Sequence, residues 1–217
     1  MLEKLILGGP MMIPLLVCSV LTLAAVIDRY LAFRKNSKVD VRAMRAEVLT
    51  FLEEDRLPDA LTLCSSTPGP VAAVLLVGLQ SYSNLRKRDE SPEAMRLIMF
   101  KAMEDYHAHA MNAVEKRFNV LSSVGNTAPL FGMAGTVTGM IGAFDAMVQA
   151  AGLDAKLVAG GIKEALITTA AGLLIALAAV IPFNIFTSMA DEISLEIEEA
   201  TSELVEFIAM QQAGRKS

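Results

Sequence analysis

Two stretches of this chain combine a bilayer-spanning length with side chains that could line a polar path for an ion. The side chains concerned are Thr136 in residues 126–149, and Glu164, Thr168 and Thr169 in residues 161–186. At about 100° per residue, Glu164 and Thr168 lie one above the other, and Thr169 is the next residue around the helix. A hydroxyl can both donate and accept a hydrogen bond, so this set predicts a polar path for an ion.

The position of Glu164 leaves two interpretations open. A carboxylate within a span costs a few kcal/mol or more unless it faces protein or water. Glu164 lies near the predicted boundary of its span, so it either lines a pore or sits at the membrane interface. Asp145 lies near the outer end of the other stretch and is interpreted first as interfacial, then as pore-lining. Thr136 alone is weak support for a path, since a helical threonine commonly bonds its own backbone.

Four glycines form a stripe along the first of these stretches. Gly132, Gly135, Gly139 and Gly142 are spaced by three, four and three residues and fall within about 80° of one another. Small residues in a membrane helix allow a second backbone to approach closely. The stripe therefore predicts helix packing rather than chemistry.

The composition indicates a chain that is partly in a membrane. Of its 217 residues, 53% are hydrophobic and 20% are charged, an apolar excess over ordinary soluble domains. Three segments reach the length needed to cross about 30 Å of hydrocarbon: residues 10–27, 129–148 and 162–181. The first segment is expected to be a retained helix and not a signal peptide, because Asp28 and Arg29 follow where a cleavage site would sit.

The basic residues predict the orientation. Fourteen Lys or Arg residues lie between the first and second spans, whereas only Lys4 precedes the first span. By the positive-inside rule the middle segment and the C-terminus are cytoplasmic and the N-terminus is periplasmic. The expected organisation is a start and first span (1–28), a cytoplasmic helical domain (29–125), a second span (126–149), a periplasmic loop (150–160), a third span (161–186) and a cytoplasmic helix (187–217).

Outside the spans the pattern is helical, with no strand periodicity. Proline and glycine predict helices over 29–57, 59–65 and 71–87, and Ser91 is expected to cap a helix that runs unbroken from 92 into the second span. The third span is expected to continue as an amphipathic helix whose buried stripe comprises Ile193, Ile197, Ala200, Leu204 and Ile208. We therefore predict an all-α integral membrane protein with long cytoplasmic extensions that form a bundle.

Nothing in the sequence predicts an enzyme, a metal site, a cofactor site or a nucleic-acid surface. His107 and His109 are two residues apart, so they face different ways on a helix. Cys18 and Cys64 are assigned to different environments, which argues against a disulfide. Seven acidic residues and no basic residue fall between 191 and 206; this run is interpreted as a solvated helix face, with a docking surface as the alternative.

Two motifs resemble the ExbB/TolQ/MotA proton-channel family. NTAPLFGMAGTVTGMIGAF is similar to its A-P-L-x-G-L-x-G-T-V-x-G-M-I-x-x-F pattern, and GIKEALITTAAGLLIA, followed by Phe183-Asn184, is similar to its G-I-x-E-A-L-x-x-T-A-x-G-L pattern. Three spans rather than four favour the ExbB/TolQ branch. In this resemblance the threonine of G-T-V corresponds to Thr136, the later threonine to Thr169 and the glutamate to Glu164.

The resemblance implies a bacterial inner-membrane motor subunit driven by the proton-motive force. It implies a pentamer of this chain around two copies of a single-span ExbD/TolR-like partner whose intramembrane aspartate carries the proton, with a TonB/TolA-like protein as a further partner. The alternative is a non-conducting membrane scaffold. The particular partner and envelope task (outer-membrane uptake, envelope maintenance, gliding or secretion), proton against sodium, and the direction of rotation stay open.

Two features depart from the family pattern. The proline usually found midway in the third helix is replaced by Ala178, and Pro182 follows four residues later, so a kink is expected about one turn nearer the cytoplasm. Thr168 beside Thr169 also gives two hydroxyls where the family needs one.

Overall fold

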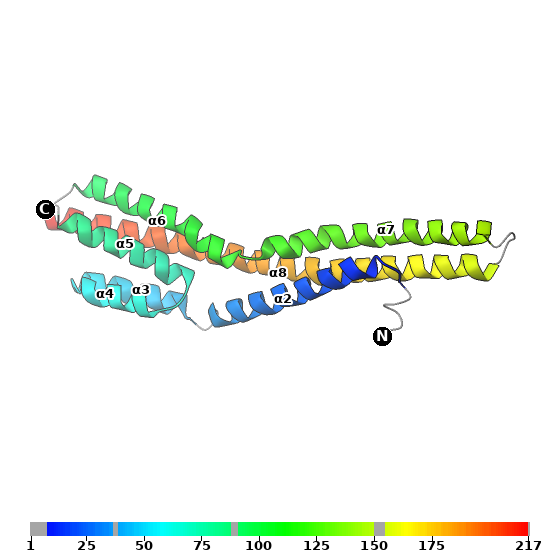
Figure 1. Ribbon diagram of the computed structural model, residues 1–217. Coiled ribbons are helices and arrows are strands. Elements are labelled where there is room, and N and C mark those ends of the chain that lie inside the picture. Colours follow the sequence, from blue (N-terminus) through cyan, green and yellow to red (C-terminus); the bar gives the residue numbers. More distant parts are fainter. Residues whose placement is uncertain (1–7, 37–38, 88–90, 150–154, 217) are drawn as a thin grey trace. The chain divides into compact units, whose positions relative to one another are not determined.

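The described part of the chain consists of α-helices joined by short turns. The computed structural model describes residues 8–36, 39–87, 91–149 and 155–216, and every regular element in these ranges is an α-helix (Figure 1). The helices are α2 (Met12–Asn36), α3 (Val41–Glu53), α4 (Leu57–Ser66), α5 (Pro70–Arg86), α6 (Pro92–Val114), α7 (Phe118–Gln149) and α8 (Ala155–Lys216). Among the described residues, α2, α7 and α8 are long and apolar enough to cross a membrane. The prediction of an all-α chain with three candidate spans is confirmed.

The chain divides into two compact units. One, here called the span unit, comprises residues 1–30 and 117–186; the other, the bundle unit, comprises residues 31–116 and 187–217. Helices α2 and α8 contribute residues to both units. Pro182 lies inside α8, which continues past it as helix.

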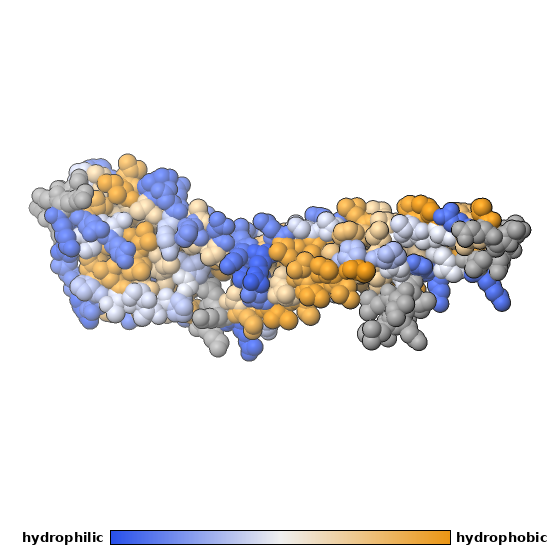
Figure 2. All heavy atoms as spheres, in the orientation of Figure 1, coloured by the Kyte–Doolittle hydropathy of each residue, from blue (hydrophilic) through white to orange (hydrophobic). Residues whose placement is uncertain are grey.

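Side chains from α2, α7 and α8 meet in the core of the span unit. Its buried members are Leu15, Cys18, Val124, Ala128, Ala176 and Ala179. The exposed face of α2 carries apolar side chains, where a helix of a soluble protein carries polar ones. Val20 and Leu23 are 60% and 62% exposed. Figure 2 shows the apolar side chains gathered along this helix. An exposed apolar stripe of this length fits a helix that contacts lipid or other membrane helices.

The bundle unit is built around the C-terminal half of α8. The predicted stripe is confirmed, because Ile193, Ile197, Ala200, Leu204 and Ile208 are all buried. Helix α5 crosses this stripe closely. A Cβ on Gly78 would lie 3.1 Å from Leu204 Cδ2 and 2.5 Å from Met103 Sδ of α6. Near the end of α8, Gln212 Nε2 donates to the hydroxyl of Tyr82 (3.0 Å).

The predicted helix over 29–57 is wrong in its length. Helix α2 ends at Asn36, and α3 begins at Val41 with Asp40 as N-cap, its carboxylate accepting the amide of Ala43 (3.0 Å). Local capping by an aspartate therefore restarts the helix where apolar periodicity alone suggested continuity.

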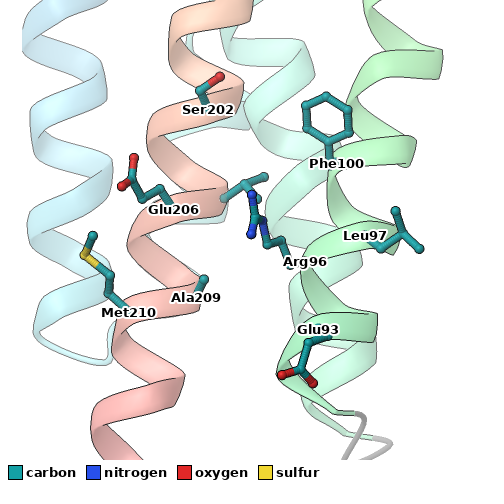
Figure 3. Close-up of a pocket in the computed structure, with 9 residues that line it drawn as sticks. Glu93, Arg96, Leu97, Phe100, Ser202, Glu206, Ala209 and Met210 are labelled. Atoms are coloured by element: carbon teal, nitrogen blue, oxygen red, sulfur yellow. The ribbon is translucent and has the colours of Figure 1, made fainter.

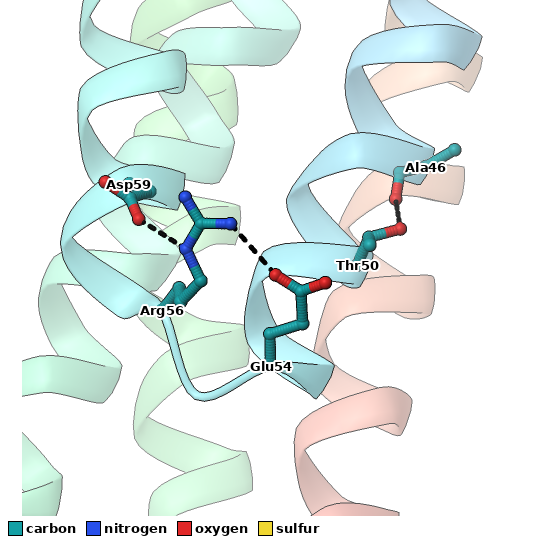
Figure 4. Close-up of polar contacts among 5 residues, drawn as sticks. All are labelled: Ala46, Thr50, Glu54, Arg56 and Asp59. Atoms are coloured by element: carbon teal, nitrogen blue, oxygen red, sulfur yellow. Dashed lines mark hydrogen bonds and ion pairs between the residues drawn. The ribbon is translucent and has the colours of Figure 1, made fainter.

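A tight turn separates α3 from α4. Asp55 adopts a left-handed φ of 58°, and α4 then begins at Leu57, so Pro58 lies in its first turn, where proline is tolerated. Figure 4 shows Arg56 in this turn, donating to Glu54 (2.9 Å) and to Asp59 (2.7 Å).

The unbroken helix predicted from residue 92 into the second span is also wrong. Helix α6 ends at Val114, Arg117 takes a left-handed φ of 72°, and α7 begins at Phe118. The break has a tertiary cause, because the Phe118 ring stacks on Phe186 and meets Phe183 edge-on. Packing of these rings fixes the start of α7 where the sequence has neither proline nor glycine.

The start of α6 is as predicted. Ser91 is its N-cap, and the Ser91 hydroxyl accepts the amide of Ala94 (3.2 Å), with Pro92 at the first helical position. Helix α5 also lies within one residue of its predicted range.

We expect Ser91→Ala to loosen the first turn of α6. Loss of an N-cap hydroxyl costs about 1 kcal/mol, so amide exchange at Ala94 should accelerate about fivefold, while Ser91→Asp keeps an acceptor and changes little. Hydrogen–deuterium exchange of the purified protein measures this. Equal exchange in the two variants would show that the hydroxyl contributes nothing.

Candidate functional site

Helices α7 and α8 approach closely along the glycine stripe of α7. A Cβ on Gly132 would lie 3.1 Å from the Cα of Thr169, and one on Gly139 would lie 3.1 Å from the carbonyl oxygen of Gly161. A Cβ on Gly135 would collide with the methyl group of Thr168. At these three glycines the two helices therefore have no room for a side chain between them.

Helix α8 contributes its own small residues to this contact, which the sequence analysis missed. A Cβ on Gly172 would lie 2.6 Å from the carbonyl oxygen of Ala128, and one on Gly161 would lie 2.5 Å from the Ala143 methyl. The missed signal was the spacing of Gly161, Ala165, Thr168 and Gly172 by four, three and four residues, which matches the stripe on α7. We call the contact between these two rows, which also includes Thr169 beside Gly132, the seam.

Gly142 stands apart from the other glycines of the stripe. A Cβ on Gly142 would meet nothing within 4 Å. The seam in this chain thus involves Gly132, Gly135 and Gly139, and Gly142 lies outside it.

Thr169 lies on the seam with its hydroxyl crossing between the helices. Its Oγ1 donates to the carbonyl oxygen of Gly132 at 2.9 Å. In an α-helix that carbonyl also faces the amide of residue 136. Thr169 and Thr136 are therefore brought to the same turn of α7. The Thr136 hydroxyl donates to the carbonyl of Met133 on its own helix (2.6 Å), and both threonines are partly buried.

Thr168 has different surroundings from its neighbour. It is fully buried, and its Oγ1 lies 2.5 Å from the carbonyl oxygen of Gly8 and 3.0 Å from that of Glu164. Both neighbours are acceptors, so the single hydroxyl hydrogen donates to backbone. The structure places this hydroxyl away from Thr169, although the two residues are adjacent in sequence.

The two carboxylates lie at different places on the α7–α8 pair. Glu164 is partly buried and its Oε1 lies against Gly9, at the start of the chain's described part. Asp145 is exposed near the end of α7. Glu164, Thr168 and Thr169 therefore lie on α8, Thr136 lies on α7 one turn after the glycine that Thr169 contacts, and Asp145 lies near the end of α7.

The bundle unit contains an open groove between α6 and α8, with a volume of about 790 Å³ (Figure 3). Its lining comprises Glu93, Arg96, Leu97, Phe100, Ser202, Val205, Glu206, Ala209 and Met210. The surface is mainly apolar. Its charged groups are of both signs.

The remaining candidate groups of the bundle unit have structural contacts. His107 Nε2 lies 2.9 Å from the Ser194 hydroxyl, and the His109 ring packs on Tyr106. Burial raises the pKa of the Cys64 thiol to about 11, so at neutral pH this residue is a protonated, unreactive thiol. In the acidic run, Glu199 and Glu203 pair with Arg45 at 3.1 and 2.6 Å.

Comparison with known proteins decides the family. The sequence pattern of the MotA/TolQ/ExbB proton channel family matches residues 66–199, which include the seam and all four candidate polar residues. The chain belongs to this family. Its resemblance to the ExbB/TolQ branch, expected from two motifs, is confirmed over most of its length.

Relatives in the family carry two names. A biopolymer transport protein ExbB of Neisseria meningitidis is 31% identical over 188 residues, which is 82% of each chain. A putative ExbB-like biopolymer transport protein of Synechocystis is 33% identical over 87% of this chain and 71% of its own. The Tol-Pal system protein TolQ of Haemophilus influenzae is 35% identical over 51% of this chain and 49% of its own.

We expect Gly135→Ala to destabilise the protein, because its new methyl group collides with Thr168 across the seam. Overpacking of this kind costs about 1–3 kcal/mol. Gly142→Ala is the matched control, since a Cβ there meets nothing within 4 Å and alanine suits a helix better than glycine. Heating the detergent-solubilised protein and measuring the folded fraction by size exclusion tests this. Equal losses in the two variants would contradict the seam.

Proposed function

We propose that this chain is the proton-conducting, stator-like subunit of an inner-membrane motor. In this proposal it uses the proton-motive force, together with an ExbD/TolR-like partner, to drive work at the cell envelope, such as transport across the outer membrane or envelope maintenance. Its membership of a proton channel family and its relatives named for biopolymer transport and the Tol-Pal system support this function.

The observation that carries the proposal is the hydrogen bond from Thr169 to the Gly132 carbonyl (2.9 Å). It holds the Thr169 hydroxyl between two candidate spans, at the carbonyl of the residue that lies one helical turn before Thr136 on α7. The hydroxyl hydrogens of Thr136 and Thr169 are both donated to backbone carbonyls in the structure, so each hydroxyl can accept from a neutral carboxylic acid as it stands and can donate to a charged carboxylate by turning away from its carbonyl. We assign Thr136 and Thr169 to the proton path, with Glu164 at its outer end.

The energy available fits a carboxylate that changes its protonation state. One charge moved through 100 mV releases about 2.3 kcal/mol. A carboxylic acid in a low-dielectric span is favoured when neutral and costly when charged, so a few kcal/mol can bias its protonation. We propose that the partner supplies this acid, because Glu164 lies near the outer end of its span.

The assembly we propose follows the family. Five copies of this chain surround the single helices of two partner copies, and a TonB/TolA-like protein takes up the work. The proposed location is the bacterial inner membrane, with the N-terminus and the 150–160 loop periplasmic and the 29–125 and 187–217 segments cytoplasmic. The excess of basic residues just after the first span supports this orientation.

The alternative function is a membrane scaffold that assembles a complex without conducting. The seam suits this role as well, since its small residues serve packing alone. The two functions differ at Thr169. In a scaffold, the Thr169 side chain contributes only through its volume, whereas in a proton path its hydroxyl group is required.

We expect Thr169→Ala to abolish partner-dependent proton flux, and Thr169→Ser to retain it. Loss of a hydrogen bond to a charged group costs about 1.5–3 kcal/mol, equivalent to a reduction of about 10- to 100-fold. Thr138→Ala is the matched control, because the Thr138 hydroxyl is exposed and bonds only its own helix. Flux into proteoliposomes with the partner present is measured. Equal flux in the Thr169 and Thr138 variants would favour the scaffold.

Replacing Glu164 by glutamine separates charge from shape. If this carboxylate lies on the proton path, Glu164→Gln should reduce the same flux at least as much as Thr169→Ala, while the complex still assembles. Asp145→Asn is the control, since Asp145 is exposed and separate from the seam. Normal flux in the Glu164 variant would place its carboxylate at the membrane interface, outside the path.

A further inference from the structure

The residues just before α2 lie against the part of α8 that holds Glu164 and Thr168. The carbonyl oxygen of Gly8 is 2.5 Å from Thr168 Oγ1, and Gly9 lies against the Glu164 carboxylate. These contacts join residues more than 150 positions apart in sequence. Residues 8 and 9 fall outside the segment that the family pattern matches, so the resemblance does not account for them.

Gly9 meets both conditions that require glycine. Its φ is 69°, a conformation that side chains disfavour. A Cβ on Gly9 would also collide with Oε1 of Glu164. Any other residue at this position would therefore strain the turn and displace the carboxylate.

The turn is held in place by the helix that follows. The amide of Met12 donates to the Gly9 carbonyl (3.1 Å), and that of Ile13 donates to Pro10 (3.2 Å). Helix α2 is in turn packed against α8, since Leu15 and Cys18 share a core with Ala176 and Ala179. The packing of α2 against α8 thus holds Gly8 and Gly9 next to α8.

The two adjacent threonines consequently have different tasks. Thr168 is fully buried and its hydroxyl donates to backbone at the start of α2 or one turn back on α8. Thr169 is partly buried and its hydroxyl crosses the seam to Gly132. One threonine thus ties α8 to the N-terminal turn, and the other bonds α8 to α7.

We propose that Gly8, Gly9 and Thr168 form a clamp that positions the Glu164 carboxylate, and that Thr168 is not on the proton path itself. The clamp fixes the first turns of α8 against α2, and Gly9 restricts where the carboxylate can lie. These are positioning residues, acting through Glu164. The functional part of this proposal, that the clamp supports conduction through Glu164, rests on the proton-conducting role proposed above. The geometric part, that the N-terminal turn contacts Thr168 and Glu164, does not.

The geometric part is tested by a disulfide. In a chain with Cys18→Ala and Cys64→Ala, the pair Gly8→Cys and Thr168→Cys should cross-link on mild oxidation. A Cβ on Gly8 would lie 3.2 Å from Thr168 Oγ1, the atom whose place a cysteine sulfur would take, so the two side chains are within reach of a disulfide. The nearby Met12 side chain is flexible and can move aside. The pair Gly8→Cys and Thr169→Cys is the control, since Thr169 faces α7.

Oxidised membranes are digested and the linked peptides are quantified by mass spectrometry. Linkage of the 8–168 pair in clear excess over the 8–169 pair supports the clamp. Equal linkage of both pairs, or none in either, overturns it. This result does not depend on whether the protein conducts protons.

The functional part is tested by non-additivity. Gly9→Ala and Thr168→Val should each lower partner-dependent proton flux severalfold, and Thr168→Ser should restore it. In a Glu164→Gln background, adding either substitution should change nothing further, because the clamp acts through that carboxylate. Additive losses, or no rescue by serine, overturn the positioning role. An absence of flux in the unmodified complex would instead reject the proposed function and leave the cross-linking result standing.

Discussion

The contact between α7 and α8 is the constraint on which the rest of the site depends. Because the facing positions are glycine, alanine and threonine, the two backbones come close enough for a side-chain hydroxyl of one helix to reach a carbonyl of the other, as Thr169 reaches Gly132. In a medium without water, such a bond satisfies a group that would otherwise be costly to bury. The small residues of the seam therefore permit both the close packing of the two helices and the hydrogen bond between them. Enlarging these residues would disturb both.

The second constraint is the length of α8. This single helix of 62 residues carries the seam in its first part and the buried stripe of the bundle unit in its last part. The size and the packing role of its apolar residues differ between its two parts. Near Thr169 they are small and allow close approach, whereas Ile197 and Leu204 are large and fill a core. The acidic side chains share the solvated face of the last part, where Arg45 pairs with two of them.

Features of the fold that depend on local periodicity could be predicted from the sequence, and those that depend on distant contacts could not. The buried stripe that includes Ile197 and the N-cap at Ser91 could both be predicted from residue type and spacing. The break at Arg117 is not, because ring packing of Phe118 imposes a left-handed residue where arginine gives no signal. At the site, the sequence offered both Thr168 and Thr169 as hydroxyls, and the family resemblance pointed to Thr169. The structure adds the different contacts of the two side chains, since Thr168 bonds the Gly8 carbonyl and Thr169 bonds the Gly132 carbonyl.

The central claim is that the hydroxyls of Thr136 and Thr169 conduct protons only together with a partner's carboxylate. It is tested most directly by measuring proton flux into proteoliposomes that contain the wild-type chain alone, the chain with a single-span ExbD/TolR-like partner, and the chain with a partner whose intramembrane aspartate is changed to asparagine. The account predicts flux in the second preparation and background in the other two. Equal flux with and without the partner's carboxylate, or none in a correctly assembled complex, would contradict it.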